Sequence, residues 1–192
     1  MSVGDSNPAA VPSPVQDVLG DDRWMSQVWQ ELFSPLHALS FGIGGDTTSH
    51  VLWRLQNGEL ENITPKVVVV WVGTNNHEHT VEQIAGGIQA IVHLINTCQP
   101  QAKVVVLRPN PLREKNSEVN RVLRASLPRL GSVQFLDVGS GFVQSDGTIS
   151  THDMFDFLHL TPAGYAAIAK PLHDLLLQLL EETPEESRPI LA

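Results

Sequence analysis

Cysteine is almost missing from this sequence, which has 192 residues and a single thiol at Cys98. One cysteine excludes an intramolecular disulfide, and it also excludes a zinc site built from several thiolates. We therefore expect a hydrophobic core to hold the fold together. A chain of this length with 42% hydrophobic residues can build such a core.

Basic residues are also scarce, since 12 Lys and Arg stand against 21 Asp and Glu and the net charge is -9 at pH 7. Phosphate-binding surfaces need clustered basic side chains, so this balance argues against a nucleic-acid or anionic membrane surface. No apolar run approaches the length of a membrane span. Residues 1–22 lack the basic and apolar regions of a signal peptide, so we expect a cytoplasmic protein.

The sequence predicts three regions of different character. Residues 1–22 are small, polar and proline-bearing, which predicts a flexible acidic arm. Residues 182–192 predict an acidic tail. Between them, residues 23–181 alternate apolar runs with helical patterns, which predicts one α/β domain with a parallel sheet covered by helices.

The strongest strand pattern covers residues 66–72, where an unbroken apolar run predicts burial on both faces of the sheet. No comparable run precedes the glycine cluster at residues 42–45, although an α/β domain usually opens with a buried strand. The other expected elements are strands at 36–42, 104–107 and 133–138, and helices at 48–57, 82–96, 117–127 and 163–180.

Three polar loops lie where α/β proteins place their sites, next to the ends of predicted strands and helices. Residues 42–46 either bring backbone N–H groups to an anion or form an ordinary tight turn. Asn75 can donate a hydrogen bond to an oxyanion, or it can close an Asx turn. His159, with Asp156 three residues earlier, can be a base with its orienting carboxylate, or a solvated surface pair.

A metal site is the main rival interpretation of these polar residues. Imidazole and carboxylate groups stand at His77, His79, His152, Asp153, Asp156 and His159. Their spacing matches no zincin pattern, and no His-Glu-x-x-His occurs. We therefore expect no metal.

Gly42-x-x-Gly45-Asp46, Gly73-Thr74-Asn75 and Asp156-x-x-His159 resemble three sequence blocks of the SGNH (GDSL-type) hydrolases. Longer runs, at residues 31–39, 70–77 and 152–160, resemble the catalytic α subunits of type I intracellular platelet-activating-factor acetylhydrolase. So do residues 20–25 and 180–186, and the resemblance therefore extends over nearly the whole chain.

The resemblance implies a flavodoxin-like α/β fold and hydrolysis of the sn-2 acetyl ester of platelet-activating factor and related ether phospholipids, without metal or organic cofactor. It implies that His159 is the general base and Asp156 its orienting partner. The Gly45 N–H and the Asn75 side chain would form the oxyanion hole. It also implies homo- or heterodimers of α subunits, and association with the lissencephaly protein, a WD-repeat β-propeller.

The nucleophile of that family is what this sequence lacks. In the family a buried strand ends in Gly-Asp-Ser, and the corresponding segment is missing between Gln27 and Val28. Gly4-Asp5-Ser6 has the right letters, but only three residues precede it, so we expect no strand to present it. Gly20-Asp21-Asp22 has no serine. We therefore expect no identifiable nucleophile and no first central strand, and the strand at 36–42 should pair with the strand at 66–72 or detach.

Two functions remain open at this point. The chain can be an acetylhydrolase subunit of weak or no activity, because a base and an oxyanion hole alone cannot form an acyl-enzyme. It can instead be a non-catalytic interaction subunit. A nucleotide-binding module is disfavoured because no phosphate loop occurs.

The loop near residues 107–109 is shorter than in the family. Residues 108–113 therefore cannot be relied on to shape the pocket as they would in the family.

Overall fold

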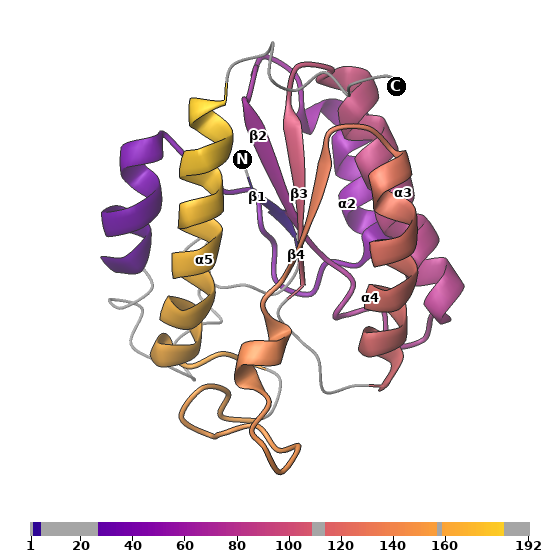
Figure 1. Cartoon of the computed structure of the whole chain (residues 1–192). Coiled ribbons are helices and arrows are strands. Elements are labelled where there is room, and N and C mark those ends of the chain that lie inside the picture. The colour runs from indigo at the N-terminus through magenta and orange to yellow at the C-terminus, as the bar shows by residue number, and fades with distance from the viewer. Residues whose placement is uncertain (1, 5–26, 109–113, 157–158, 183–192) are drawn as a thin grey trace, which may run out of the picture.

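The computed structural model describes residues 2–4, 27–108, 114–156 and 159–182. Within these ranges, four strands form one parallel sheet in the order β1-β2-β3-β4, and helices cover both of its faces (Figure 1). The strands are β1 (Ser2–Gly4), β2 (Val67–Trp71), β3 (Lys103–Arg108) and β4 (Val133–Asp137). The expected parallel α/β architecture is confirmed. The predicted arm and tail lie almost entirely outside the described residues and stay predictions.

One face of the sheet is covered by α2 (Thr48–Arg54), α3 (Val81–Cys98) and α4 (Glu114–Ser126) (Figure 1). Successive side chains of a strand point to opposite faces, so Val68 and Val70 of β2 pack with these helices, whereas Val67 and Val69 face the other way. All four valines are buried. The predicted burial of this strand on both faces is therefore confirmed.

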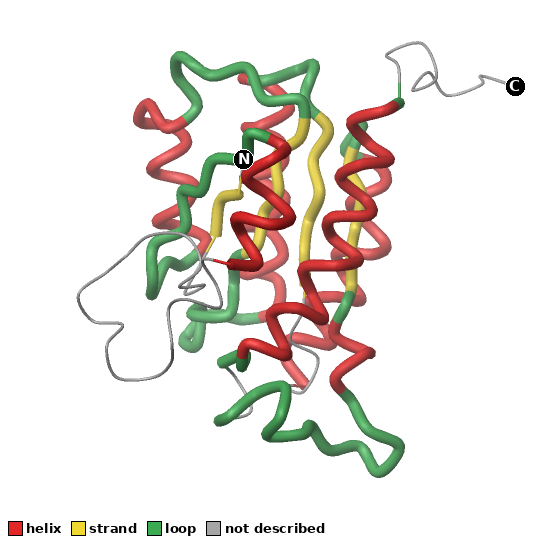
Figure 2. Tube along the Cα trace, turned by 90° about the vertical axis from the view of Figure 1, so that its left-hand side faces the viewer, coloured by secondary structure: helices red, strands yellow, loops and turns green. Residues whose placement is uncertain are grey.

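The opposite face is covered by α5 (Pro162–Glu181) and by two short helical turns, η3 (Trp29–Phe33) and η4 (Ser34–Leu36). Figure 2 shows α5 and this short helical segment in front of the strands. Thr161 caps α5 by accepting a hydrogen bond from the Gly164 N–H at 3.1 Å, and Pro162 occupies the first turn. The helix expected at residues 163–180 is therefore confirmed.

The remaining elements are short and follow their helix or strand directly. α2 continues into η5 (Leu55–Glu59), where Gly58 adopts a φ of +104° and ends the helical run. α4 ends before η6 (Leu127–Arg129), which contains Pro128, and proline cannot donate the backbone hydrogen bond that would continue the helix. η7 (Gly139–Phe142) follows β4.

The strand predicted at residues 36–42 is wrong. Leu36 ends η4, His37 adopts a left-handed φ of 54°, and within the segment only Ser40 takes part in a β-bridge. The segment therefore forms no strand and does not pair with β2. The reason is that β2 has another neighbour along this edge.

That neighbour is β1, whose residues Ser2, Val3 and Gly4 pair in parallel with Val69, Val70 and Trp71. The prediction that no strand can precede Gly4-Asp5-Ser6 is therefore wrong. Backbone N–H and C=O groups along a buried strand need partners, and even three residues can provide them. β1 stands where the first strand was expected to be missing, although it is very short. Asp5 and Ser6 lie outside the described residues.

Candidate active site

Asp156 and His159 form a hydrogen-bonded pair immediately before α5. Asp156 Oδ2 lies 2.5 Å from His159 Nδ1, and Asp156 Oδ1 accepts the His159 backbone N–H at 2.7 Å. The side chains are 49% and 43% exposed. A carboxylate at Nδ1 fixes the ring so that Nε2 can accept a proton, which is the arrangement of a general base.

The loop that carries this pair is fixed against α5 at both ends. Met154 and Leu160 form an antiparallel bridge, and the Thr161 N–H donates to the Asp153 carbonyl at 2.9 Å. Gly164 in the first turn of α5 lies so close that a Cβ there would collide with the Asp153 carbonyl. The close approach of the helix to the loop therefore requires glycine at this position.

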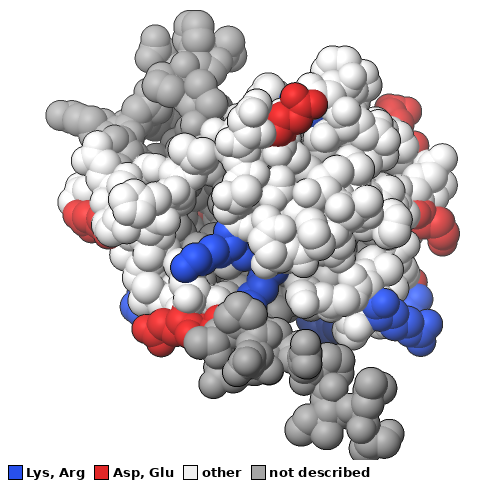
Figure 3. Space-filling model, turned by 90° about the horizontal axis from the view of Figure 1, so that it is seen from above, with Lys and Arg blue, Asp and Glu red and all other residues white. Residues whose placement is uncertain are grey.

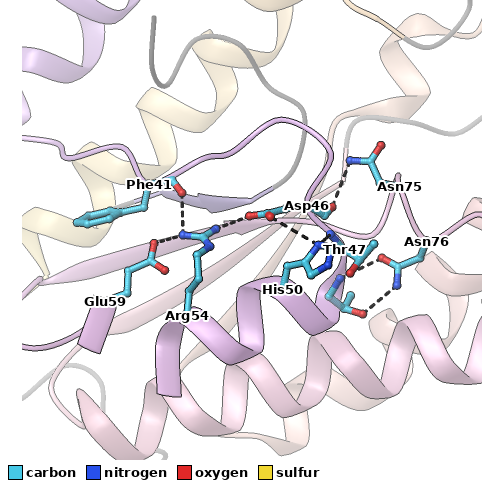
Figure 4. Close-up of polar contacts among 9 residues, drawn as sticks. Phe41, Asp46, Thr47, His50, Arg54, Glu59, Asn75 and Asn76 are labelled. Carbon is cyan, nitrogen blue, oxygen red and sulfur yellow. Dashed lines mark hydrogen bonds and ion pairs between the residues drawn. The ribbon is translucent and has the colours of Figure 1, made fainter. Parts of the chain in front are cut away.

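The predicted oxyanion residues come from two different connections, one between η4 and α2 and the other between β2 and α3. Asn75 Nδ2 donates a hydrogen bond to the carbonyl oxygen of Asp46 at 3.2 Å, and Gly45, just before Asp46, has a φ of +86° (Figure 4). The Asn75 amide thus contacts the turn that contains Gly45. A backbone N–H and an amide side chain at neighbouring positions are the kind of donors that stabilise an oxyanion.

Asn76 fixes the position of that loop, and sequence reasoning did not separate it from Asn75. Its side chain is 1% exposed, accepts the Thr48 N–H at 3.1 Å and donates to Thr48 Oγ1 at 3.0 Å. It thereby ties the loop after β2 to the start of α2 (Figure 4). The only signal in the sequence was a second asparagine next to the first.

Arg54 is the residue that sequence reasoning missed altogether. Its Nη2 lies 2.5 Å from Asp46 Oδ2, and its Nη1 donates to the Phe41 carbonyl at 3.1 Å and also pairs with Glu59 (Figure 4). Burial raises the pKa of Glu59 above its ordinary value of 4.5, although Arg54 opposes the shift. Arg54 lies five to thirteen residues from these partners in the sequence, whereas neighbours on a helix surface are three or four residues apart. No local sequence pattern therefore indicates these contacts.

Arg108 supports the Gly73–Asn75 loop from inside the protein. It is 2% exposed, and its guanidinium donates to the Val72 carbonyl at 2.7 Å and to Asn120 Oδ1 at 2.9 Å. Gly73 follows with a φ of +112°, which favours glycine. The shorter loop near residues 107–109 had made a family-like role for residues 108–113 unreliable. In the structure Arg108 ends β3, and residues 109–113 lie outside the described ranges.

The other polar residues of these loops form no metal cluster in the part of the chain that the structure describes. His152 pairs with the adjacent Asp153 at 3.0 Å, and its side chain is well exposed. Asn75 follows β2, and the loop that carries Asp156 and His159 follows β4 and precedes α5, so both come after the carboxyl ends of parallel strands. Sites of α/β sheets occur at this edge.

Comparisons with known proteins agree with this arrangement. A model of the GDSL-like lipase/acylhydrolase family matches residues 2–167. The chain is 60% identical to rat platelet-activating factor acetylhydrolase IB subunit alpha2 and 62% identical to its chicken counterpart, with complete coverage of both proteins in each case. It is 53% identical to the human subunit alpha1, over 98% of this chain and 97% of that protein.

The alignment with the rat subunit extends over 229 positions, although this chain has 192 residues, so 37 positions have no residue here. The fold is also shared with distant proteins. A G-D-S-L family protein from Veillonella parvula superimposes with a TM-score of 0.68 at 13% identity, over 92% of this chain and 97% of that protein. A family 3 carbohydrate esterase from Clostridium thermocellum gives 0.67 at 20% identity, with coverage of 95% and 98%. Among the described residues, no helix combines the length and apolarity needed to cross a membrane.

Proposed function

The chain belongs to the GDSL-like lipase/acylhydrolase family, and we propose that it is an esterase subunit for the sn-2 acetyl ester of platelet-activating factor and related ether phospholipids. The observation that carries this proposal is the Asp156–His159 hydrogen bond of 2.5 Å at the edge of the sheet. The names of the 53–62% identical relatives support the substrate class.

Each side chain of the site has a role in the proposed chemistry. Asp156 holds the proton on Nδ1 of His159, so that Nε2 can take a proton from the attacking group. The Gly45 N–H and the Asn75 amide stabilise the oxyanion of the acetyl carbonyl. Asn75 must then exchange its hydrogen bond to the Asp46 carbonyl for one to the substrate. One such donor contributes about 3–4 kcal/mol to the transition state.

We propose that hydrolysis by this chain is weak or absent. Among the described residues, the ring of His159 hydrogen-bonds only to Asp156. A base that has no serine hydroxyl at Nε2 can activate only water, which reacts far more slowly than an acyl-enzyme pathway. The serine nearest to the end of β1 in the sequence is Ser6, two positions after Gly4.

Labelling with a fluorophosphonate probe, followed by peptide mapping, tests the proposal together with acetate release from platelet-activating factor. We expect trace hydrolysis that falls at least about tenfold in His159→Ala and in Asn75→Ala. His152→Ala is the matched control, because His152 also pairs with an aspartate but should leave hydrolysis unchanged. Strong labelling that maps to Ser6 would show that a nucleophile exists and that the activity is not weak. Equal rates of acetate release in the His159→Ala, Asn75→Ala and His152→Ala variants would show that the site assignment is wrong.

A non-catalytic interaction subunit is the second candidate, and the 37 alignment positions without residues favour it. In that case the chain would bind other α subunits without hydrolysing esters. Co-expression with a full-length α subunit and sedimentation analysis measure this directly. A stable heterodimer combined with no labelling and no acetate release would favour the second candidate over the first.

The cellular context is part of the same proposal. We propose a cytoplasmic protein that forms homo- or heterodimers of α subunits and binds a lissencephaly-type WD-repeat β-propeller. The word subunit in the names of the relatives supports assembly in general terms. Pull-down with a purified β-propeller tests the last partner.

A further inference from the structure

A cavity of about 320 Å³ lies between α5, the helical turns η3 and η4, and β2. Its size falls within the range of small-molecule sites in proteins. The innermost part of its lining is apolar and buried, and includes Phe33, Val67, Val69, Ile168, Ala169 and Leu172. Asp156 and His159 are not among the residues that line it.

The cavity runs along β2, on the face of the sheet that α5 covers. The pairing of β1 with β2 begins only at Val69. The cavity includes Val69 and Trp71, and it also extends to Pro65, Lys66 and Val67, which precede this register. A strand of three residues spans about 10 Å and covers less than the full length of β2. The cavity therefore extends along both the part of β2 that pairs with β1 and the part that precedes this pairing.

The mouth of the cavity is polar and basic, in contrast to its interior. The exposed residues of the lining are His37, Thr64 and Lys66. Lys66 takes part in no ion pair among the described residues. Figure 3 views the molecule from the end at which β2 begins. Basic side chains stand near the middle of this face and also at its margin, and acidic side chains lie both beside the central basic ones and at the margin.

We infer that this cavity binds the alkyl chain of a single-chain amphiphile whose terminal group is anionic. An unbranched alkyl chain fits an elongated apolar space between a helix and a strand, and its transfer from water is favourable for each methylene that is buried. The anionic group stays at the mouth, where Lys66 provides a positive charge at the solvent boundary. A long-chain carboxylate is the simplest ligand of this class.

Binding at this site is independent of the proposed ester hydrolysis. A fatty acid contains no ester bond, and its binding needs neither His159 nor Asn75. His159→Ala should therefore bind the ligand as well as the parent chain does. Loss of esterase activity would leave the inference untouched, and failure to bind would leave the proposed function untouched.

Tryptophan fluorescence provides the measurement, because Trp29 and Trp71 line the cavity whereas Trp53 is exposed on α2. Dodecanoate brominated at its terminal carbon is titrated below its micelle concentration. We expect the tryptophan fluorescence to be quenched saturably, with one ligand bound per chain. Dodecanoate without bromine should compete for the site and reverse the quenching. Hexanoate should compete at least about tenfold more weakly, because it buries fewer methylenes. Trp29→Phe together with Trp71→Phe should remove most of the quenching.

Two variants separate the apolar interior from the basic mouth. Ala169→Leu adds side-chain volume to the wall of the cavity and should weaken binding at least about tenfold, with the fold checked by circular dichroism. Lys66→Gln changes an exposed residue and should weaken dodecanoate about fivefold while leaving dodecanol unchanged. Lys170→Gln, on the exposed side of α5, is the matched control and should have no effect.

The inference is overturned if no saturable quenching occurs, including the case in which a second copy of the chain covers the cavity. It is also overturned if hexanoate and dodecanoate bind equally, or if quenching persists without Trp29 and Trp71. An equal loss of dodecanoate binding in Lys66→Gln and Lys170→Gln would contradict the role of the mouth.

Discussion

Replacing Arg54 by methionine tests whether the Gly45–Asp46 turn is held by one buried cation. The side chain of Arg54 is 17% exposed, and those of Asp46 and Glu59 are 9% exposed. Methionine retains most of the hydrophobic volume of arginine but removes the charge and all three polar contacts. Two carboxylates would then remain close together, nearly buried and without their cation.

The expected loss of unfolding free energy is about 3–5 kcal/mol near pH 7.5, the cost of removing one partner from a buried ion pair. Arg54→Lys keeps the charge but cannot bridge two carboxylates and a carbonyl at once, so we expect a loss of about 1–3 kcal/mol. Arg121→Met is the matched control, because the Arg121–Glu118 pair is exposed and screened by solvent, so its removal should change the stability far less than Arg54→Met does.

The loss in Arg54→Met should shrink as the pH falls. Burial already raises the pKa of Glu59 above 4.5 in the folded protein, and the removal of Arg54 removes the main influence that lowers it. A carboxyl group whose folded pKa is raised binds its proton more tightly in the folded state, so protonation favours folding and the penalty is largest at high pH. The difference from the parent should therefore be clearly smaller near pH 5 than near pH 7.5.

Urea unfolding, followed by circular dichroism at both pH values, measures these differences. If Arg54→Met is too unstable for a reliable folded baseline, Arg54→Lys still provides the comparison with Arg121→Met. A loss below about 1 kcal/mol in Arg54→Met, or one that grows on acidification, would refute the reasoning. Loss of acetate release in Arg54→Lys without loss of stability would instead assign Arg54 to positioning the turn.

The remaining predictions concern the packing of α2 on α3 and the loop that follows β2, and each is measured by urea unfolding. Gly86→Ala should stabilise α3 by about 0.5–1 kcal/mol, because its Cβ meets open space, whereas Gly87→Ala should destabilise the protein by about 1–3 kcal/mol, because its Cβ would lie 2.7 Å from Thr48 Oγ1. Equal effects of these two neighbours would contradict the observed packing of α2 on α3. Asn76→Ala should cost about 1–3 kcal/mol, because it leaves the Thr48 N–H without its buried acceptor; a cost below about 0.5 kcal/mol would mean that the bond is dispensable. Gly73→Ala should cost about 1–3 kcal/mol, since its φ is +112° and the new methyl would meet two side chains at 3.1 Å, and a neutral result would show that the loop adapts.

Regular elements were predictable because each carries its own periodic signal. The valine run of β2, the apolar face of α3 and the Thr161–Pro162 start of α5 are encoded in adjacent residues. The pair of Asp156 and His159 was also predictable, because three residues of separation in a turn suffice to bring the two side chains together. The meeting of Asn75 with the Gly45–Asp46 turn followed from the family resemblance, not from local pattern.

The strand predicted at residues 36–42 failed because a strand exists only when a neighbour provides its hydrogen bonds. Its apolar residues predicted a strand, but β1 occupies the edge of β2, and the segment forms no strand. For the same reason Ser2–Gly4 forms a strand that no propensity of three residues could predict. Strand identity is decided by pairing across the sheet, which sequence windows do not contain.

The sequence by itself determined the class of the fold, the buried faces of its helices and strands, and the residues that make up the candidate base and oxyanion site. The tertiary structure alone decided what depends on long-range contacts. It placed Arg54 between Asp46 and Glu59, it put Arg108 beneath the Gly73 loop, and it left a cavity beside the short β1. Burial, ion pairing and unfilled volume arise between segments that are distant in the chain, so they appear only once the chain is folded.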